Sequence, residues 1–590
     1  MLFGKHINRY YFKYLHLIIL GLIALVAVDY FQLEIPKLYK YLINGINDGS
    51  VEVDGILLPF DLNFLLDHIC KPMLLIILAM VVGRFLWRIC FFGSGILVET
   101  NLRSRMFNRC KNLSQQYYQE NKVGNLMSLF TNDIETVQDC FGSGILMFAD
   151  ALVLGGLSIL KMGNMDFTLT ILSLIPMSFM LCVAVIVGKF MTKKWKRRQE
   201  AFSSLSDFSQ ESFSGIAVIK AFVKEFKELW AFKKLNKENE NANVEYTKAS
   251  TLLRISVTLF VESVICVILG YGGYLVYIGQ FNAGELLEFF GYFNSIVWPV
   301  MDISELIEMQ SRGKASLNRI SELLDAKQDV IDDLDAKPVS KIEGEIEFKN
   351  LSFRYPDGDY DALKNVNLKI NAGESVGIIG KTGSGKTTLV DLILRNYNVP
   401  DGTLFVDGYD VNDITIHSLR ENTAYVPQDN FLFSDTIQNN IAFASDTTDI
   451  ELVKRYASLA QVSDNIEDFT DGYKTMLGER GVTVSGGQKQ RISIARALMK
   501  DAPVLILDDS LSAVDTKTEK ALLDSLQAER KGKTTILIAH RISTIEQMDK
   551  IVFIDDGKII AVGAHEELYA TCEEYHKMVE LQKLEEEKEG

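Results

Sequence analysis

Six apolar stretches in the first half of the chain constrain its fold more than any other feature of the sequence. They cover residues 15–35, 72–92, 140–160, 165–190, 252–278 and 283–303. Each is near the roughly 20 residues that a helix needs to cross the hydrocarbon core of a bilayer. A large soluble protein could instead bury apolar helices in its core, but six such stretches favour a helical bundle that spans a membrane.

The distribution of charge orients these predicted spans. Lys5, Arg9 and Lys13 precede the first span, and further lysines and arginines follow the second and the fourth. The loop 48–67 has acidic residues and no lysine or arginine. Excess positive charge marks the cytoplasmic side of a membrane, so we expect a multi-pass protein of the cell (plasma) membrane with both termini in the cytoplasm.

Two long polar stretches, 93–139 and 191–251, continue the predicted spans on the basic side. Neither contains proline, and Glu, Lys, Asn and Phe recur in them at three- and four-residue spacing, which is typical of helix. We expect the second to fifth spans to extend well beyond the membrane.

The sequence changes character after a charged segment. From residue 344 onward, short apolar strands, turns and helical segments alternate, as in a soluble α/β domain. We predict a transmembrane domain at 1–325, a linker at 326–341 and an α/β domain at 342–590.

Composition excludes several other classes. The 590 residues carry a formal net charge of −16, whereas a nucleic-acid-binding surface needs an excess of basic residues. The seven cysteines are scattered and form no CxxC pair, so neither a disulfide framework nor a zinc site is indicated.

The clearest functional motif is a glycine-rich loop between a predicted strand, 376–379, and a predicted helix, 388–394. It has the G-x-x-x-x-G-K-T pattern of a phosphate-binding loop in the context that this pattern requires. Glycines let backbone N–H groups surround phosphate oxygens at the start of a helix. Lys386 would contact the β- and γ-phosphates of ATP, and Thr387 would ligate Mg²⁺. The residues expected to hold the nucleotide here are Gly380, Thr382, Gly383, Ser384, Gly385, Lys386, Thr387 and Thr388.

A second predicted strand, 504–508, is apolar until it ends in Asp508. An aspartate there can hold the hydration shell of Mg²⁺ beside a phosphate-binding loop. Alone, it could equally be an ordinary strand end, but the glycine-rich loop in the same domain favours the metal-binding interpretation.

A third motif lies between these two. Ser485, Gly486, Gly487 and Gln488 precede a predicted helix at 489–499. Adjacent glycines at a helix start form another phosphate-sized site. A second phosphate site within one nucleotide-binding domain makes sense if it faces the nucleotide of another subunit.

Together these motifs resemble those of the ABC transporter family, specifically exporters in which six spans precede one ATPase domain. The resemblance covers nearly the whole chain, and residues 485–488 are its most specific mark. It implies a polytopic α-helical membrane domain followed by an α/β P-loop ABC ATPase domain, with ATP and Mg²⁺ as cofactors. It also implies that ATP hydrolysis drives alternating access of the membrane domain.

The resemblance implies roles for three further residues. Tyr355 matches the aromatic residue that stacks on adenine. Gln428 matches a glutamine that contacts Mg²⁺ and faces the membrane domain, and His540 matches a histidine near the γ-phosphate.

It also implies functions for short segments. The segment 475–481, with Glu479 and Arg480, is similar to one that contacts the intracellular loops of a partner, and 512–515 resembles the D-loop of the family. The implied coupling helices, which dock on ATPase domains, are 124–131 and 209–215.

One position departs from the family pattern. The family's catalytic base is a glutamate directly after the metal-binding aspartate, but this chain has Asp509 there. An aspartate is one methylene shorter, and misplacement by about an ångström can cost on the order of 10²-fold in rate. Such substitutions occur in one half of heterodimeric exporters of the family. We therefore expect a heterodimer with a second half-transporter, in which this chain's ATP site is weak and residues 485–488 complete the stronger site. A homodimer with slow hydrolysis is the alternative.

The substrate is encoded only weakly. Aromatic and methionine side chains, which can accept varied amphipathic molecules, occur in the sixth and first spans at Phe289, Phe290, Tyr292, Phe293, Trp298, Met301, Tyr30 and Phe31. Packing and interfacial anchoring explain each of them equally well. Asp29 and Glu262 are functional candidates because ionisable residues inside a membrane are costly. We expect a small, cationic, drug-like substrate. The alternatives are a lipid or peptide exporter, or an ABC-type membrane sensor or regulated channel.

Overall fold

The computed structural model describes residues 3–53, 55–478, 481 and 483–589. The chain divides into two compact units. One comprises Met1–Lys111 and Val123–Ala326, and the other comprises Asn112–Lys122 and Lys327–Gly590. Nothing in the sequence pattern predicts that Asn112–Lys122 groups with the C-terminal part of the chain.

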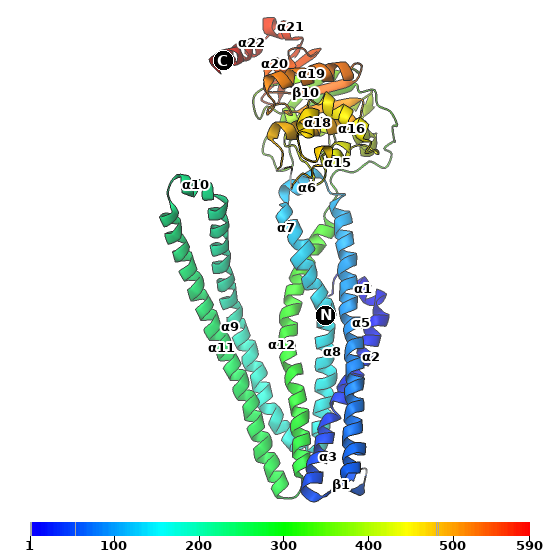
Figure 1. Ribbon diagram of the computed structural model, residues 1–590, viewed down its shortest axis with the longest axis vertical. Coiled ribbons are helices and arrows are strands. Elements are labelled where there is room, and N and C mark those ends of the chain that lie inside the picture. Colours follow the sequence, from blue (N-terminus) through cyan, green and yellow to red (C-terminus); the bar gives the residue numbers. More distant parts are fainter. Residues whose placement is uncertain (1–2, 54, 479–480, 482, 590) are drawn as a thin grey trace. The chain divides into compact units, whose positions relative to one another are not determined.

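The first unit is built almost entirely of helices (Figure 1). They are α1 (Asn8–Lys13), α2 (Leu15–Gln32), α3 (Ile35–Asp48), α4 (Leu62–Phe64), η1 (Leu65–Cys70), α5 (Lys71–Cys110), α7 (Val123–Ser128), η2 (Leu129–Asp133), α8 (Ile134–Met165), α9 (Phe167–Ser214), α10 (Ile216–Ala221), α11 (Glu225–Tyr277) and α12 (Ala283–Asp325). A short antiparallel hairpin of β1 (Ser50–Val53) and β2 (Ile56–Pro59) follows α3.

Four helical segments of the described chain are long and apolar enough to cross a membrane by length and composition. They are Leu15–Asp48, Leu62–Cys110, Val123–Met165 and Glu225–Tyr277, and they contain the first, second, third and fifth predicted spans. The fourth predicted span begins α9, where Phe167–Phe179 is a shorter apolar stretch. Several side chains of that span, between residues 180 and 189, lie outside those that the structure describes.

The sixth predicted span forms the first half of α12 and is less apolar than the others. Glu285, Glu288 and Asp302 lie within or beside it. Its helical character agrees with the prediction, and a capping box formed by Asn282 and Glu285 fixes its start. Within the unit α12 packs against α8 and α3, so its polar residues can face other helices.

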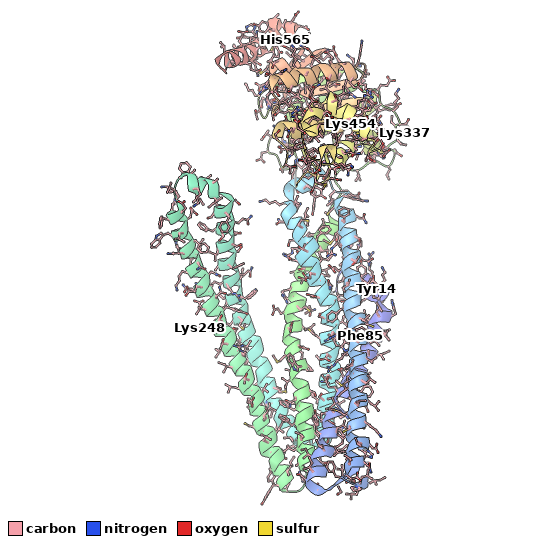
Figure 2. All side chains as sticks on the ribbon, viewed as in Figure 1. Tyr14, Phe85, Lys248, Lys337, Lys454 and His565 are labelled. Atoms are coloured by element: carbon pink, nitrogen blue, oxygen red, sulfur yellow. The ribbon has the colours of Figure 1, made fainter. Side chains whose placement is uncertain are left out.

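Apolar side chains cover much of the outer surface of the helical unit. Phe85 on α5, labelled in Figure 2, is 69% exposed. In water such a surface would be unstable, but lipid tails are as apolar as leucine. The exposure pattern is therefore that of helices surrounded by lipid or by other membrane helices.

The helices α9 and α11 pair along their length, and α10 closes the far end of this hairpin (Figure 1). The implied coupling helix at 209–215 falls on the last turns of α9, which ends at Ser214, and on its C-cap Gly215. A separate short helix, α10, follows directly. The other implied coupling helix, 124–131, falls on α7 and the start of η2. Side chains on and beside α10, including Phe213, Phe222 and Phe226, are exposed.

The second unit combines two sheets with short helices. Its strands are β3 (Ile346–Phe353), β4 (Leu363–Ile370), β5 (Ser375–Ile379), β6 (Leu404–Val406), β7 (Tyr409–Asp410), β8 (Thr423–Val426), β9 (Val504–Asp508), β10 (Thr534–Ile538), β11 (Lys550–Asp555) and β12 (Lys558–Gly563). Its helices are α6 (Gln115–Glu120), α13 (Lys386–Ile393), α14 (Ile416–Glu421), α15 (Ile437–Ala442), α16 (Ile450–Leu459), α17 (Ser463–Glu467), η3 (Gly472–Lys474), α18 (Gly486–Met499), α19 (Thr516–Glu529), α20 (Ile542–Ile545), α21 (His565–Thr571) and α22 (Glu573–Glu589). The strands predicted at 376–379 and 504–508 and the helices predicted at 388–394 and 489–499 are confirmed.

The larger sheet has the strand order β12-β11-β5-β10-β9-β8. The strands β11, β5, β10, β9 and β8 are parallel, and β12 is an antiparallel edge. In β9, Val504 and Ile506 join one buried cluster, whereas Leu505 and Leu507 join another. Both faces of the strand are therefore covered, which explains the continuous apolar run that predicted it.

A second, antiparallel sheet has the order β4-β3-β6-β7. Asp407, in the turn between β6 and β7, accepts backbone N–H bonds from Glu343 (2.6 Å), Gly344 (3.0 Å) and Glu345 (2.8 Å). It has a φ of 50°, which aspartate and asparagine tolerate better than most residues. One side chain thus ties the beginning of β3 to the neighbouring turn.

We predict that Asp407→Ala lowers the free energy of unfolding by roughly 2 kcal/mol, because it leaves three donors without this partner and strains the backbone. Asp407→Asn should cost clearly less, since it keeps one acceptor oxygen and tolerates the left-handed conformation. Thermal unfolding of the detergent-solubilised chain, followed by fluorescence, measures both. Equal losses for the two variants would contradict the assigned bonds.

Candidate functional site

The carboxyl ends of four parallel strands meet at one edge of the larger sheet. In the register, Ile538 of β10 lies beside Ile378 of β5 and Asp508 of β9, and β8 lies beside β9. The glycine-rich loop, Gln428, Asp509 and His540 follow these strands directly. Ligand sites in open parallel sheets form at such edges.

These segments line one cavity of about 690 Å³. The sequence-predicted residues in its lining are Tyr355, Thr382, Gly383, Gly385, Lys386, Thr387, Thr388, Gln428, Asp508, Asp509 and His540. A larger cavity of about 810 Å³ lies among α19, β10 and α20 and includes none of these residues. The candidate site is therefore the smaller cavity.

The glycine-rich loop is packed tightly against its surroundings. A Cβ at Gly380 would collide with the carbonyl oxygen of Ile554, so only glycine fits there. Lys386 is 6% exposed, and its Nζ donates to the carbonyl oxygens of Gly380 and Lys381, each at 2.9 Å. Burial lowers the pKa of its ammonium, and the charges of Asp508 and Asp509 oppose this shift.

Asp508 is almost completely buried, at 1% exposed. Burial raises the pKa of its carboxyl to about 6, while a hydrogen bond from Thr387 favours the ionised form. Its Oδ2 and the Oγ of Ser384 have no hydrogen-bond partner among the described residues. Unsatisfied buried oxygens at a phosphate-binding loop are a chemical fit for a hard cation and a phosphate group.

Within the described residues, no group of three His, Cys, Asp or Glu side chains could hold a metal ion unaided. A Mg²⁺ ion at Thr387 and Asp508 would therefore need phosphate or water oxygens to complete its coordination, which is how Mg²⁺ is usually bound. The residues present fit Mg²⁺ only in combination with a nucleotide.

Asp509 adopts a left-handed conformation, with a φ of 45°. Its backbone N–H donates to the carbonyl oxygen of Ile538 at 3.0 Å. Its carboxylate oxygen Oδ2 lies 3.4 Å from Nε2 of Gln428, which donates to it. The structure thus brings together the two polar side chains that follow β8 and β9.

Tyr355 is held in a fixed orientation at the other side of the cavity. Its hydroxyl is 2.9 Å from Oγ1 of Thr388. Its ring meets those of Phe353 and Tyr397 edge to face, each with centroids 5.1 Å apart. Burial raises the pKa of its phenol to about 12, so the hydroxyl stays protonated at neutral pH.

The turn that carries His540 is fixed by a residue far away in the sequence. Gln582 of α22 donates from Nε2 to the carbonyl oxygen of His540 at 2.7 Å. Its Oε1 accepts from the N–H of Ile542 at 2.8 Å. The imidazole of His540 is exposed and lines the cavity.

Residues 485–488 do not belong to the lining of this cavity, as far as the structure describes it. Ser485 and Gln488 form a capping box at the start of α18. A Cβ at Gly487 would lie 2.7 Å from the carbonyl oxygen of Ala513, so the glycine permits close packing against segment 512–515. Gln490 also binds that segment, accepting from the N–H of Ala513 at 3.0 Å. Glu479 and Arg480 lie outside the described residues.

Two residues at the site were missed by the sequence interpretation. Gln119 of α6 lines the cavity and accepts a hydrogen bond from the hydroxyl of Tyr397 at 2.7 Å. Gln582 holds the His540 turn. Neither lies in a motif, and only the tertiary fold brings α6 and α22 to this edge.

Comparison with known proteins adds the family context. The family model described as "ABC transporter transmembrane region" matches residues 18–300, and the model described as "ABC transporter" matches residues 363–512. The chain is 35% identical to the "Probable multidrug resistance ABC transporter ATP-binding/permease protein YheI" of Bacillus subtilis, over 100% of this chain and 98% of that protein.

Two further comparisons agree. The chain is 33% identical to the "Multidrug resistance-like ATP-binding protein MdlA" of Escherichia coli, over 96% of this chain and 94% of that protein. The fold is similar to a solved bacterial Atm1-family ABC exporter with ATP bound, with a TM-score of 0.76, 24% identity, and coverage of 98% of this chain and 100% of that one.

We predict that Gln582→Leu lowers the rate of ATP hydrolysis by roughly tenfold, because it removes both bonds that fix the turn before α20. The affinity for ATP should change little, since Gln582 does not line the cavity. Lys577→Leu is the control, because Lys577 lies on the same helix, is exposed and pairs with the exposed Glu573. The measurement is steady-state ATPase activity beside nucleotide binding. An unchanged rate for Gln582→Leu would contradict the positioning role.

Proposed function

The chain belongs to the ABC transporter family as an exporter-type protein, with a helical transmembrane region fused to an ATPase domain that drives translocation, and from this premise we propose that it exports small amphipathic, drug-like compounds from the cell as one subunit of a heterodimer. In this proposal, ATP bound on this chain's own phosphate-binding loop is hydrolysed slowly. ATP bound on the partner's loop is hydrolysed faster. The carrying observation is Asp509 in the position directly after the buried Asp508.

Nucleotide binding would rest on residues already in place around the cavity. The phosphates would lie against the backbone of the loop 380–385 and the ammonium of Lys386, and the adenine would lie against Tyr355, whose orientation Thr388 fixes. Thr387 and Asp508 would hold Mg²⁺, and the ion would neutralise negative charge on the phosphate oxygens. Bringing a cation beside Asp508 would also favour its ionised carboxylate, which burial alone disfavours.

The position of Asp509 supports slow hydrolysis at this site. A catalytic carboxylate must reach the attacking water, and a shift of about an ångström can cost on the order of 10²-fold in rate. The Asp509 side chain is short, and its carboxylate lies within hydrogen-bond distance of Gln428. Nucleotide bound on this chain would then persist and hold the two ATPase domains together.

Residues 485–488 support the complementary half of the proposal. They form an ordered, capped helix start away from this chain's own cavity, and Gly486 is exposed. Such a helix N-terminus can contact the phosphates of a nucleotide on another subunit. The partner's nucleotide would thus be hydrolysed with help from this chain.

The proposed substrate class rests first on the relatives, whose names refer to multidrug resistance. It rests second on those predicted substrate-contacting residues of the sixth span that are exposed in the structure. Phe289, Tyr292 and Phe293 are at most 1% exposed, so they pack the core of the helical unit. Trp298 and Met301 are exposed and remain candidates to contact substrate. The aromatic surface predicted from the sixth span is therefore smaller than expected.

We predict an asymmetric response to two kinds of substitution. Asp509→Asn should leave most of the transport-coupled ATPase activity, because the strong site uses the partner's base. Ser485→Arg and Gly486→Asp should abolish it, because they obstruct the helix N-terminus that completes the strong site. Steady-state ATPase of each variant, purified with its partner, tests this. Complete loss with Asp509→Asn, or full activity of this chain alone, would favour a homodimer with a working Asp509.

The proposed orientation places both termini and the ATPase domain in the cytoplasm. In a cysteine-free background, Glu52→Cys on the exposed edge of β1 should react with a membrane-impermeant maleimide in intact cells, because the loop 48–67 faces outward. The matched control, Ser203→Cys on α9, should react only after permeabilisation. The reverse pattern would invert the assigned topology.

A further inference from the structure

Arg395 is the largest fully buried side chain among the described residues, and it is charged. It is 2% exposed and lies directly after Leu394, the C-cap of α13. Its backbone is left-handed, with a φ of 48°. Burying a guanidinium group is costly unless it is hydrogen-bonded. Its bonding partners therefore indicate what this side chain does in the α/β unit.

The partners of Arg395 come from two segments of the chain. Its Nη1 donates to the carbonyl oxygens of Val411 (3.3 Å) and Ile414 (3.5 Å), between β7 and α14. Its Nη2 donates to the carbonyl oxygen of Ile331 at 3.1 Å. Ile331 lies in the segment 327–341, which follows α12 in the sequence and belongs to the α/β unit. We call 327–341 the connecting segment.

Other bonds hold the connecting segment to the α/β unit near Arg395. Asn398 donates from Nδ2 to the carbonyl oxygen of Asp329 at 2.6 Å. Asp332 accepts from the N–H of Ile416, the first residue of α14, at 2.7 Å. Its carboxylate also lies 3.8 Å from Nη1 of Arg395. The connecting segment is therefore attached to the α/β unit from Asp329 onward.

The end of α12 is attached in a similar way, but to the helical unit. Arg109 of α5 donates to the carbonyl oxygen of Ala326. Only Lys327 and Gln328 lie between Ala326 and Asp329 in the sequence. Three residue steps reach at most about 10 Å, whatever the arrangement of the two units. The chain therefore has little slack between its two attachment points.

The backbone of Arg395 is fixed to the end of the helix that follows the phosphate-binding loop. Its N–H donates to the carbonyl oxygen of Leu392 at 3.0 Å. Its own carbonyl oxygen accepts from Nη2 of Arg420 at 2.9 Å. The helix α13 begins at Lys386, the residue expected to contact the phosphates. One short helix therefore lies between the phosphate-binding loop and the side chain that holds the connecting segment.

We propose that Arg395 is a positioning residue that holds the connecting segment to the end of α13, so that displacement of α12 and nucleotide binding at the loop 380–385 are coupled. Such coupling is reciprocal, because each event changes the free energy of the other by the same amount. The proposal requires only ATP-driven translocation. It does not depend on the proposed substrate or on the proposed heterodimer.

Hydrogen–deuterium exchange can follow both ends of this connection in one experiment. The full-length protein is used in lipid nanodiscs, together with any subunit that purifies with it. Peptides of 380–390 report nucleotide binding, and peptides of α12 report the helical unit. In the wild type, ATP with Mg²⁺ and vanadate should slow exchange in the loop and change exchange in α12. Slower exchange in the loop without any change in α12 would overturn the proposal.

Two buried arginines give a matched pair of variants. Arg395→Met removes the bond to Ile331. Slower exchange in the loop should remain, whereas the change in α12 should fall by about threefold or more. Arg530→Met is the control, because Arg530 is 7% exposed and donates to the carbonyl oxygens of Pro503 (2.9 Å) and Thr534 (2.8 Å), outside the connecting segment. Its responses should equal those of the wild type. Equal losses in both variants would indicate a general loss of stability and overturn the positioning role.

A second pair of variants leaves Arg395 in place. Two glycines inserted between Lys327 and Gln328 lengthen the chain between the attachment points by about 7 Å. They should reduce the change in α12 as Arg395→Met does. The same insertion between Ser340 and Lys341, which are exposed and lie beyond the attached residues, should leave it unchanged. A full response with the first insertion, or the same loss with both, would overturn the proposal.

Discussion

Parallel hydrogen bonding between β5, β10, β9 and β8 brings four segments that are far apart in the sequence to one edge of a sheet. The register sets Asp508 beside Ile538 and Ile538 beside Ile378, so the segments that follow these strands line the same cavity. Both faces of this sheet are buried, which leaves the strand ends as the place where polar groups can be solvated. The position of the chemistry thus follows from the pairing of apolar strands.

Burial then changes the pKa values of the polar residues at that edge of the sheet. Asp508 and Lys386 are both nearly inaccessible to solvent. Burial raises the pKa of the Asp508 carboxyl and lowers the pKa of the Lys386 ammonium, so it favours the uncharged form of each. Such groups gain most from a ligand that supplies opposite charge, because the cost of burying them has already been incurred in folding.

The two units are linked by more than the segment after α12. The segment Asn112–Lys122, between α5 and α7 in the sequence, belongs to the α/β unit. Through Gln119 it contacts Tyr397, whose ring meets Tyr355 at the nucleotide cavity. Within the α/β unit, a single side chain, Tyr397, therefore separates Gln119 from Tyr355, the residue proposed to contact adenine.

The sequence by itself determined the helical membrane half, the α/β half and the motif residues of the cavity. Apolar length, strand–loop–helix order and glycine spacing are local properties, and local properties are visible in a single chain. Only the tertiary structure decided that Phe289 and Phe293 pack a core, that the short helix between α9 and α11 begins at Ile216, and that Gln582 and Gln119 reach the cavity. These facts depend on which helix faces pack together, and that choice is made by contacts between residues far apart in the chain, which no local pattern encodes.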